Sequence, residues 1–199
     1  MPPKLDAGRR RAEVVAAALR IVARDGAASL SLRKVADEAG LNVGSVRHYF
    51  DGSDDLLTAT ADDVGRRMGG RLARHRLDGV AGDWREGVAA FVEEVLPLDA
   101  ERRDEAAVLL EFILASRTRP LLAEATARMG RDLHDALAAA LASVGVPDHE
   151  HEATRLSALV GGLTLDTVTP HGTLTAEQVR EALRRHLDSL PGRPAGRRQ

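Results

Sequence analysis

The chain has 199 residues, of which 44% are hydrophobic, enough for the core of one large domain or two small ones. It contains no cysteine, which excludes disulfides, thiolate catalysis and cysteine-ligated zinc. No apolar run approaches the ~18 residues of a membrane span, and the N-terminus lacks the apolar segment of a signal peptide. We therefore expect a soluble cytoplasmic protein without a membrane partner.

Charge is distributed unevenly along the chain. The net charge is −2, but residues 1–50 hold nine basic and five acidic side chains, so that part carries +4 and the remainder −6. A basic module joined to an acidic body is typical of a small DNA-binding part on a body that does not touch DNA. A solvated charge distribution without any partner would give the same numbers.

The N-terminal residues 1–8 show no periodicity, and we expect them to form a disordered arm. Arginines occupy the next three positions, 9–11, either as a phosphate-contacting arm or as the solvated start of a helix. The apolar spacing predicts a helix from about Arg10 to Arg24, and Gly26 can end it.

Residues 31–50 have the pattern of two short helices around a turn. Ser31 is placed to cap the first helix, and Gly40 can take the left-handed conformation that ends it. A second helix opens at Asn42 or Val43. This arrangement lays the second helix into the DNA major groove, although an ordinary helical hairpin in an all-α core fits the spacing about equally well.

Two features of the second helix favour DNA. Its first turn holds small residues that allow close approach of the backbone, and its exposed face carries Arg47, His48 and Tyr49, which suit phosphates and base edges. We expect Ser45 and Arg47 to read bases, and Ser31, Arg33 and His48 mainly to hold the DNA backbone. The predicted DNA-binding residues are Ser31, Arg33, Val43, Gly44, Ser45, Arg47, His48, Tyr49 and Ser53.

The rest of the chain reads as helix throughout, which predicts an all-α fold. Further helices are expected over about 53–75, 83–96, 99–118, 120–145, 148–169 and 175–190. Arg67, Arg71 and Arg74 share one face of the first of these, which we interpret as solvated. We expect a helix-turn-helix DNA-binding domain at 9–55, a helical ligand-binding and dimerisation domain at 56–190, and a disordered basic tail at 191–199.

The stretch from Gly40 to Phe50, followed by the leucine pair 56–57, resembles the recognition-helix signature of TetR-family transcriptional regulators. Residues 14–26 resemble the first helix of that family, and residues 31–36 its second. The form Arg-His-Tyr-Phe at 47–50 is closest to the branch typified by the choline-responsive repressor of betaine synthesis. The family usually has a phosphate-contacting lysine where Ser53 stands, so that ionic contact is in doubt here.

The resemblance implies a homodimeric repressor that binds double-stranded operator DNA and is released from it by a small-molecule effector. Candidate effector contacts, for which core packing or surface placement is the alternative, are Trp84, Phe91, Glu111, Phe112, Met129 and Thr164. Candidate dimerisation residues on the last two long helices are Leu156, Leu159, Val160, Leu163, Leu183 and Leu187. The low aromatic content, 3%, argues against an aromatic cage for a quaternary ammonium effector.

Sequence patterns of catalysis are missing, so we expect no enzyme, no cofactor and no metal site. The stretch His149-Glu150-His151 resembles a zinc-protease motif, but Ala153 stands where the second histidine would be required. No dinucleotide fingerprint, phosphate-binding loop or hydrolase nucleophile elbow occurs. Two rival interpretations stay open: a small all-α enzyme, and a helical protein–protein adaptor without DNA binding.

Overall fold

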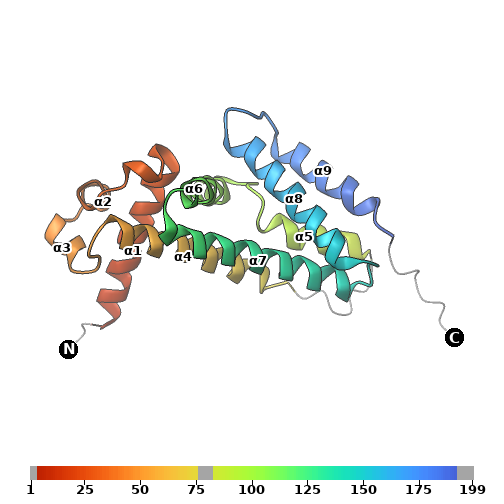
Figure 1. Cartoon of the computed structure of the whole chain (residues 1–199), viewed down its shortest axis with the longest axis horizontal. Coiled ribbons are helices and arrows are strands. Elements are labelled where there is room, and N and C mark those ends of the chain that lie inside the picture. Colours follow the sequence, from red (N-terminus) through yellow and green to blue (C-terminus); the bar gives the residue numbers. More distant parts are fainter. Residues whose placement is uncertain (1–3, 76–82, 192–199) are drawn as a thin grey trace. The chain divides into compact units, whose positions relative to one another are not determined.

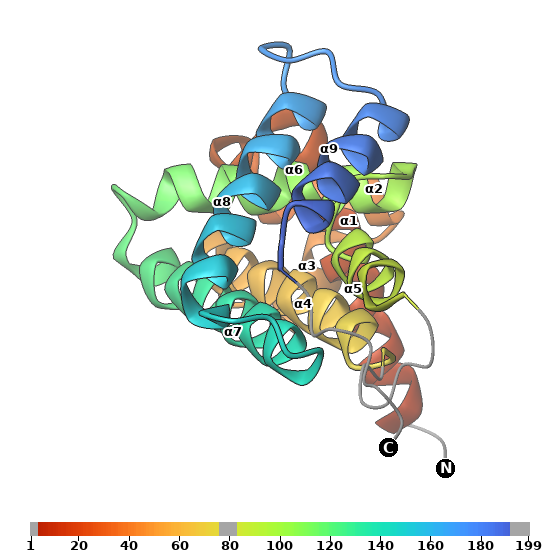
Figure 2. The ribbon, with the colours of Figure 1, turned by 90° about the vertical axis from the view of Figure 1, so that its right-hand side faces the viewer.

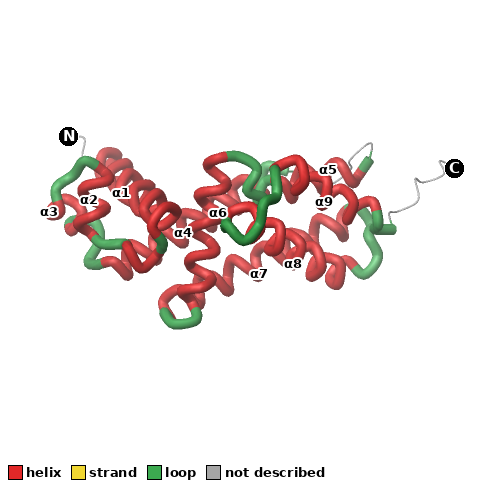
Figure 3. The backbone as a smooth tube through the Cα atoms, turned by 90° about the horizontal axis from the view of Figure 1, so that it is seen from above, coloured by secondary structure: helices red, strands yellow, loops and turns green. Residues whose placement is uncertain are grey.

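The computed structural model describes residues 4–75 and 83–191, and within these ranges the chain is helical, without a strand (Figure 3). The expected all-α fold is confirmed. In chain order the elements are α1 (Lys4–Asp25), the 3-10 helix η1 (Ala27–Ser29), α2 (Leu32–Ala39), α3 (Val43–Arg47), α4 (Ser53–Leu72), α5 (Trp84–Glu93), α6 (Ala100–Ser116), α7 (Pro120–Ser143), α8 (His149–Val168) and α9 (Ala176–Asp188). The disorder expected for residues 1–3 and 192–199 lies outside the described residues.

Helix α1 begins six residues earlier than the sequence suggested. It starts at Lys4, so residues 4–8 belong to a helix instead of a disordered arm. Glu13 pairs with Arg9 at 3.9 Å and with Arg10 at 3.3 Å, one turn apart on the same helix. Such pairs favour the helical conformation, and of the two interpretations of the arginines the structure supports the start of a helix.

The chain forms two compact units, and each is described by itself. The first unit holds residues up to Arg67 together with Asp104–Arg128, and the second holds Met68–Arg103 together with the residues from Met129 onward. The first unit thus contains α1, η1, α2, α3 and the start of α4, and also the end of α6 and the start of α7. It extends beyond the helix-turn-helix segment, and the expected domain boundary between residues 55 and 56 stays a prediction.

In the first unit, α1 packs against α2 and α2 against α3 (Figure 1). Apolar side chains recur at helical spacing along α1 and α4, and they are buried. This packing holds the helices of the unit in position. The largest completely buried side chains of this unit are Ile21, Phe50, Leu56, Leu57, Phe112 and Leu122.

In the second unit, α9 lies beside α8 and α5 (Figure 2). Its apolar stripe is buried in a core shared with the end of α7. Arg85, in the first turn of α5, donates to the carbonyl oxygens of Leu187 and Leu190 at 3.2 and 2.8 Å, and so satisfies the open C-terminal end of α9. A capping box begins α9, because Thr175 and Gln178 exchange both of its hydrogen bonds.

Candidate nucleic-acid interface

The turn between α2 and α3 is built by local hydrogen bonds. Ser31 Oγ accepts the amide of Lys34 at 3.2 Å, and Gly40 ends α2 with φ +65°, in the left-handed region that favours glycine. Asn42 caps α3 by accepting the Ser45 amide at 2.8 Å. The cap assigned to Ser31, the stop at Gly40 and the start of α3 are therefore as the sequence predicted.

The Ser45 side chain is already hydrogen-bonded within the protein. Its hydroxyl donates to Asn42 Oδ1 at 3.1 Å, and the residue is half-buried. In this state the Ser45 oxygen can only accept a hydrogen bond, as from the exocyclic amine of adenine or cytosine. The protein's own packing also favours glycine at position 44, because a Cβ there would lie 3.2 Å from Asn42 Oδ1.

The outward face of the helix pair is basic and open to solvent. Arg33 at the start of α2 and Arg47 at the end of α3 are exposed, and neither has an ion-pair partner among the residues that the structure describes. His48 is exposed as well, and its ring packs edge-on against Tyr49 with centroids 5.1 Å apart. Arginine side chains held apart from carboxylates are ready to bind phosphates or guanine.

A carboxylate between α1 and α2 fixes the angle at which this face is presented. Glu38 accepts from Arg20 at 2.8 Å and from Arg24 at 3.3 Å, so α2 is tied to two successive turns of α1. These hydrogen bonds, first that from Arg20, hold the pKa of Glu38 below its ordinary value. Arg11 lies over the ring of Phe50 at 4.9 Å, which places a further cation beside the end of the helix-turn-helix.

The first turn of α4 carries two acids and no basic residue. Asp54 and Asp55 place acidic charge next to the recognition helix. However, Asp55 accepts the backbone amide of Asp51 at 3.2 Å, and Asp54 lies 3.7 Å from a guanidinium nitrogen of Arg119. Both acids therefore have a partner within the protein, although the Asp54 side chain stays 72% exposed.

Glu111, a candidate effector contact, serves a different purpose in the first unit. Its carboxylate accepts the amide of Ala27 at 3.0 Å and so caps the turn between α1 and α2. Gly26, just before that turn, has φ +81°, and a Cβ there would lie 3.1 Å from Glu111 Oε2. The turn thus needs glycine both for its conformation and for this close approach. Apart from Gly26, no feature of the sequence indicated this contact.

The arginines of α4 are not the solvated face that we expected. Arg67 donates to Asp63 at 2.7 Å and lies 3.7 Å from Glu105, whose side chain is only 2% exposed. Arg71 donates to the carbonyl oxygen of Glu94 at 3.0 Å, and only Arg74 is largely exposed. A buried carboxylate needs a charged or hydrogen-bonding partner, and Arg67 supplies one for Glu105.

The remaining effector candidates are distributed over both units. Trp84 is half-buried and stacks on Arg85 at 4.4 Å, while Phe91 and Thr164 are buried in the second unit. Met129 is half-buried in that unit, and Phe112 is fully buried in the first. Their assignment to an effector site stays a prediction.

The predicted dimerisation residues need correction. Five of the six have side chains in the protomer's own core, and only Leu159 is partly exposed. An apolar stripe shows that a helix is covered without showing by what, and here α5, α7, α8 and α9 cover one another. The five buried residues, which cannot form a surface for a second copy, are Leu156, Val160, Leu163, Leu183 and Leu187.

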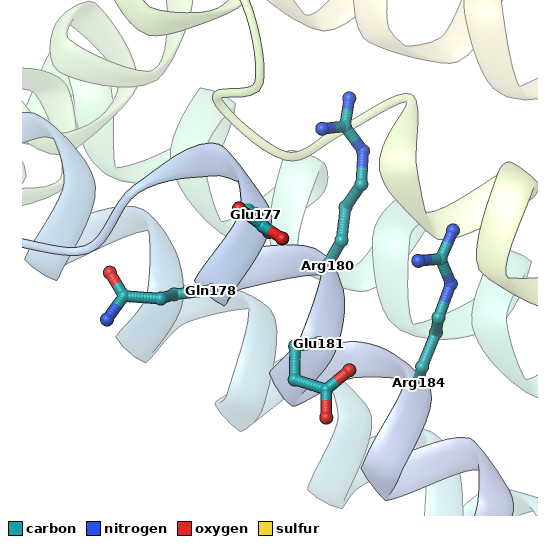
Figure 4. A pocket seen from close by; sticks show the side chains of 5 residues that line it. All are labelled: Glu177, Gln178, Arg180, Glu181 and Arg184. Atoms are coloured by element: carbon teal, nitrogen blue, oxygen red, sulfur yellow. The ribbon is translucent and has the colours of Figure 1, made fainter.

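A hollow of about 530 Å³ lies along α9 in the second unit, and charged side chains line it (Figure 4). Arg180 and Arg184 extend to the same side of the helix, where both approach Glu93, at 3.3 and 3.9 Å. Gln178 points away to the other side. A hollow made by one charged helix face lacks the apolar walls of a small-molecule site.

Helices of the described ranges are not long and apolar enough to cross a membrane. Within the same ranges, the histidine, aspartate and glutamate side chains form no group of three that could hold a metal ion. A capped helix-turn-helix with an exposed arginine on each of its two helices defines the chain as a DNA-binding protein of the helix-turn-helix class.

Comparison with known proteins specifies the family. Residues 14–60 match the profile described as bacterial regulatory proteins of the tetR family, and residues 84–192 match that of the BetI-type transcriptional repressor, C-terminal. The regulator BetI of Burkholderia thailandensis is 30% identical over 186 residues, 91% of this chain and 93% of that protein. The chain therefore belongs to the TetR family of transcriptional regulators, with a C-terminal part of the BetI type.

Solved structures agree with this placement. A transcriptional regulator from Rhodococcus sp. Rha1 superposes with a TM-score of 0.80 at 29% identity, over 89% of this chain and 94% of that one. A regulator from Saccharomonospora viridis, solved in complex with choline, gives a TM-score of 0.75 at 23% identity, over 94% and 100% of the two chains. The chain is thus a DNA-binding transcriptional regulator, as its recognition-helix pattern predicted.

Proposed function

We propose that this regulator is a homodimeric repressor that binds operator DNA through α2 and α3 and releases it when a small-molecule effector binds its C-terminal part. The observation that carries the proposal is the outward face of the helix-turn-helix, where Arg33 and Arg47 are exposed and form no ion pair within the described residues. An effector shifts the equilibrium between DNA-binding and released forms only by its differential affinity for the two. The cytoplasmic location expected from the sequence stays a prediction.

In this proposal α3 recognises the DNA bases. Arg47 is long enough to reach guanine from the end of the helix, and the Ser45 oxygen accepts from adenine or cytosine while its proton stays on Asn42. Arg33 and Ser31 lie at the start of α2, the helix that crosses the DNA backbone in this geometry, so they hold phosphate without reading bases. His48 joins the backbone contacts on the other side of the groove.

Dimerisation is assigned to the outward face of α8. Ala158, Gly161 and Gly162 are exposed there, and the neighbouring Leu165 is 42% exposed although it is a large apolar residue. A Cβ added to either glycine would meet nothing within 4 Å in the protomer, so the small residues are not required by its own packing. Small side chains let a helix of a second copy approach closely.

The effector is not identified by its relatives. The choline complex belongs to a protein that is 23% identical, and the second unit's aromatic residues Trp84 and Phe91 are engaged with Arg85 and with the core. We keep Trp84, Phe91, Glu111, Phe112, Met129 and Thr164 as candidates for the effector site, with Glu111 the weakest because its carboxylate is in use. Neither catalysis nor an adaptor role is proposed, because the family consists of regulators.

A gel-shift assay with the duplex DNA upstream of the protein's own gene tests this function, since such regulators often control adjacent genes. We expect a discrete shifted complex that unlabelled specific DNA competes away and scrambled DNA of equal length does not. A reporter placed under the same DNA should be expressed more strongly when the protein is absent. Undetectable binding to any upstream duplex would favour the adaptor, and a reporter that falls without the protein would indicate an activator.

A further inference from the structure

The first turn of α4 lies next to the recognition helix and carries no basic residue of its own. Only residues 48–52 separate Arg47, the end of α3, from Ser53, the start of α4. When α3 occupies the major groove, about 12 Å wide, the segment that follows it lies at the groove wall, where the phosphates are. Ser53 can offer one neutral hydrogen bond there, and Asp54 offers a side chain that is 72% exposed and repels phosphate.

A guanidinium from a different part of the chain lies beside the first turn of α4. Arg119 ends the connection from α6 to α7, and its Nη1 lies 3.7 Å from Asp54 Oδ1. Its side chain is 38% exposed, and Arg117 in the same connection is exposed too. Both residues and Asp54 belong to the first unit, so this placement is a property of one compact body.

We propose that Arg119 contacts the DNA backbone from outside the helix-turn-helix and replaces the cation that Ser53 does not provide. This inference rests on the proposed function. In the free protein Arg119 is held beside the groove wall by its long, solvent-exposed pair with Asp54, which contributes little stability. A phosphate accepts both nitrogens of the guanidinium fork, so the side chain exchanges Asp54 for phosphate or is shared between them.

A second exposed ion pair on α4, formed with α7, provides a contrast to the pair of Arg119 with Asp54. Arg128 of α7 pairs with Asp62 of α4 at 2.8 Å, with both side chains about as exposed as those of the first pair. Asp62 lies eight residues further along α4 than Asp54, a distance of about 12 Å along the helix axis. Arg128 thus forms the same type of exposed ion pair with α4 but lies well away from the first turn.

The salt dependence of DNA binding tests the proposal. Each phosphate contact contributes about 0.9 to the slope of log affinity against log salt, so Arg119→Gln should flatten the slope by about 1.8 in a dimer. Between 50 and 200 mM salt this makes the variant roughly tenfold less salt-sensitive than the wild type. Arg128→Gln should keep the wild-type slope, and thermal melting of each variant verifies that it is folded.

The alternative is that Arg119 only neutralises Asp54, and a second pair of variants separates the two. In an Asp54→Asn background there is no charge at position 54 for Arg119 to neutralise. If neutralisation is its only role, adding Arg119→Gln leaves the slope unchanged, and that result would overturn the proposal. A persisting loss of slope in that background supports it. An Arg119→Gln slope equal to that of the wild type would also overturn it. If the wild type bound no duplex at all, the proposed function itself would fail, which distinguishes the two failures.

Discussion

The hydrogen bond from Ala27 to Glu111 ties α6 to the turn that sets α2 against α1, and it yields a quantitative prediction. Ala27 is only 4% exposed, and its amide has the Glu111 carboxylate as acceptor at 3.0 Å. Replacing Glu111 by Leu fills similar space but leaves that amide without an acceptor. Losing a hydrogen bond to a charged group in such a setting costs about 1–3 kcal/mol.

Amide hydrogen exchange measured residue by residue reports this cost where it arises. Since 1.4 kcal/mol corresponds to a factor of ten, the Ala27 amide of Glu111→Leu should exchange about 5- to 150-fold faster than in the wild type. Glu111→Gln keeps an acceptor oxygen at the same position and should show a much smaller increase. Equal exchange of Ala27 in all three proteins, or equal acceleration in both variants, would refute the reasoning.

Three further predictions concern DNA reading, pH dependence and assembly. Against a randomised duplex library, Arg33→Ala should weaken all sequences about equally, whereas Arg47→Ala should cost about 1–3 kcal/mol on the preferred site and relax one or two positions; a uniform loss for Arg47→Ala would make it a phosphate contact. Because the folded-state pKa of Glu38 is lowered, its contribution to stability is present above its ordinary pKa of about 4.5 and is lost as pH falls through the folded value, so urea denaturation should separate wild type from Glu38→Gln at pH 7 and progressively less as the pH falls below 4.5; a constant difference would contradict this. Gly161→Arg should give folded monomers in sedimentation, since the protomer has room for the side chain, and dimers of wild-type strength would move the interface off α8.

Local signals in the sequence were sufficient for the helices and for the helix-turn-helix. Caps such as Ser31 and the Thr175 capping box act within one turn of chain, and so does the left-handed Gly40. Contacts between residues far apart in the chain could not be predicted. Nothing in the sequence pairs Glu111 with Ala27 or Arg119 with Asp54, because each partner is an ordinary charged or backbone group until the fold brings it close.

The assembly surface shows a different reason for failure. Leu156 and Leu183 were assigned to a dimer interface because their stripe indicates a covered helix face, but the same periodicity results whether the cover is a helix of the same chain or of a second copy. The structure assigns these residues to the protomer's own core. That leaves the small residues of α8, which no periodicity rule selects, as the outward face.

Repeated selection of the purified wild-type protein on a randomised duplex library, followed by sequencing of the bound DNA, tests the central claim most directly. A dimer that reads DNA through α2 and α3 should enrich a palindromic motif, with half-sites centred about 10 bp apart or a multiple of that spacing. It should do so at a salt concentration where non-specific binding is weak. Recovery of DNA without any enriched motif, or of a single unpaired half-site, would contradict the account.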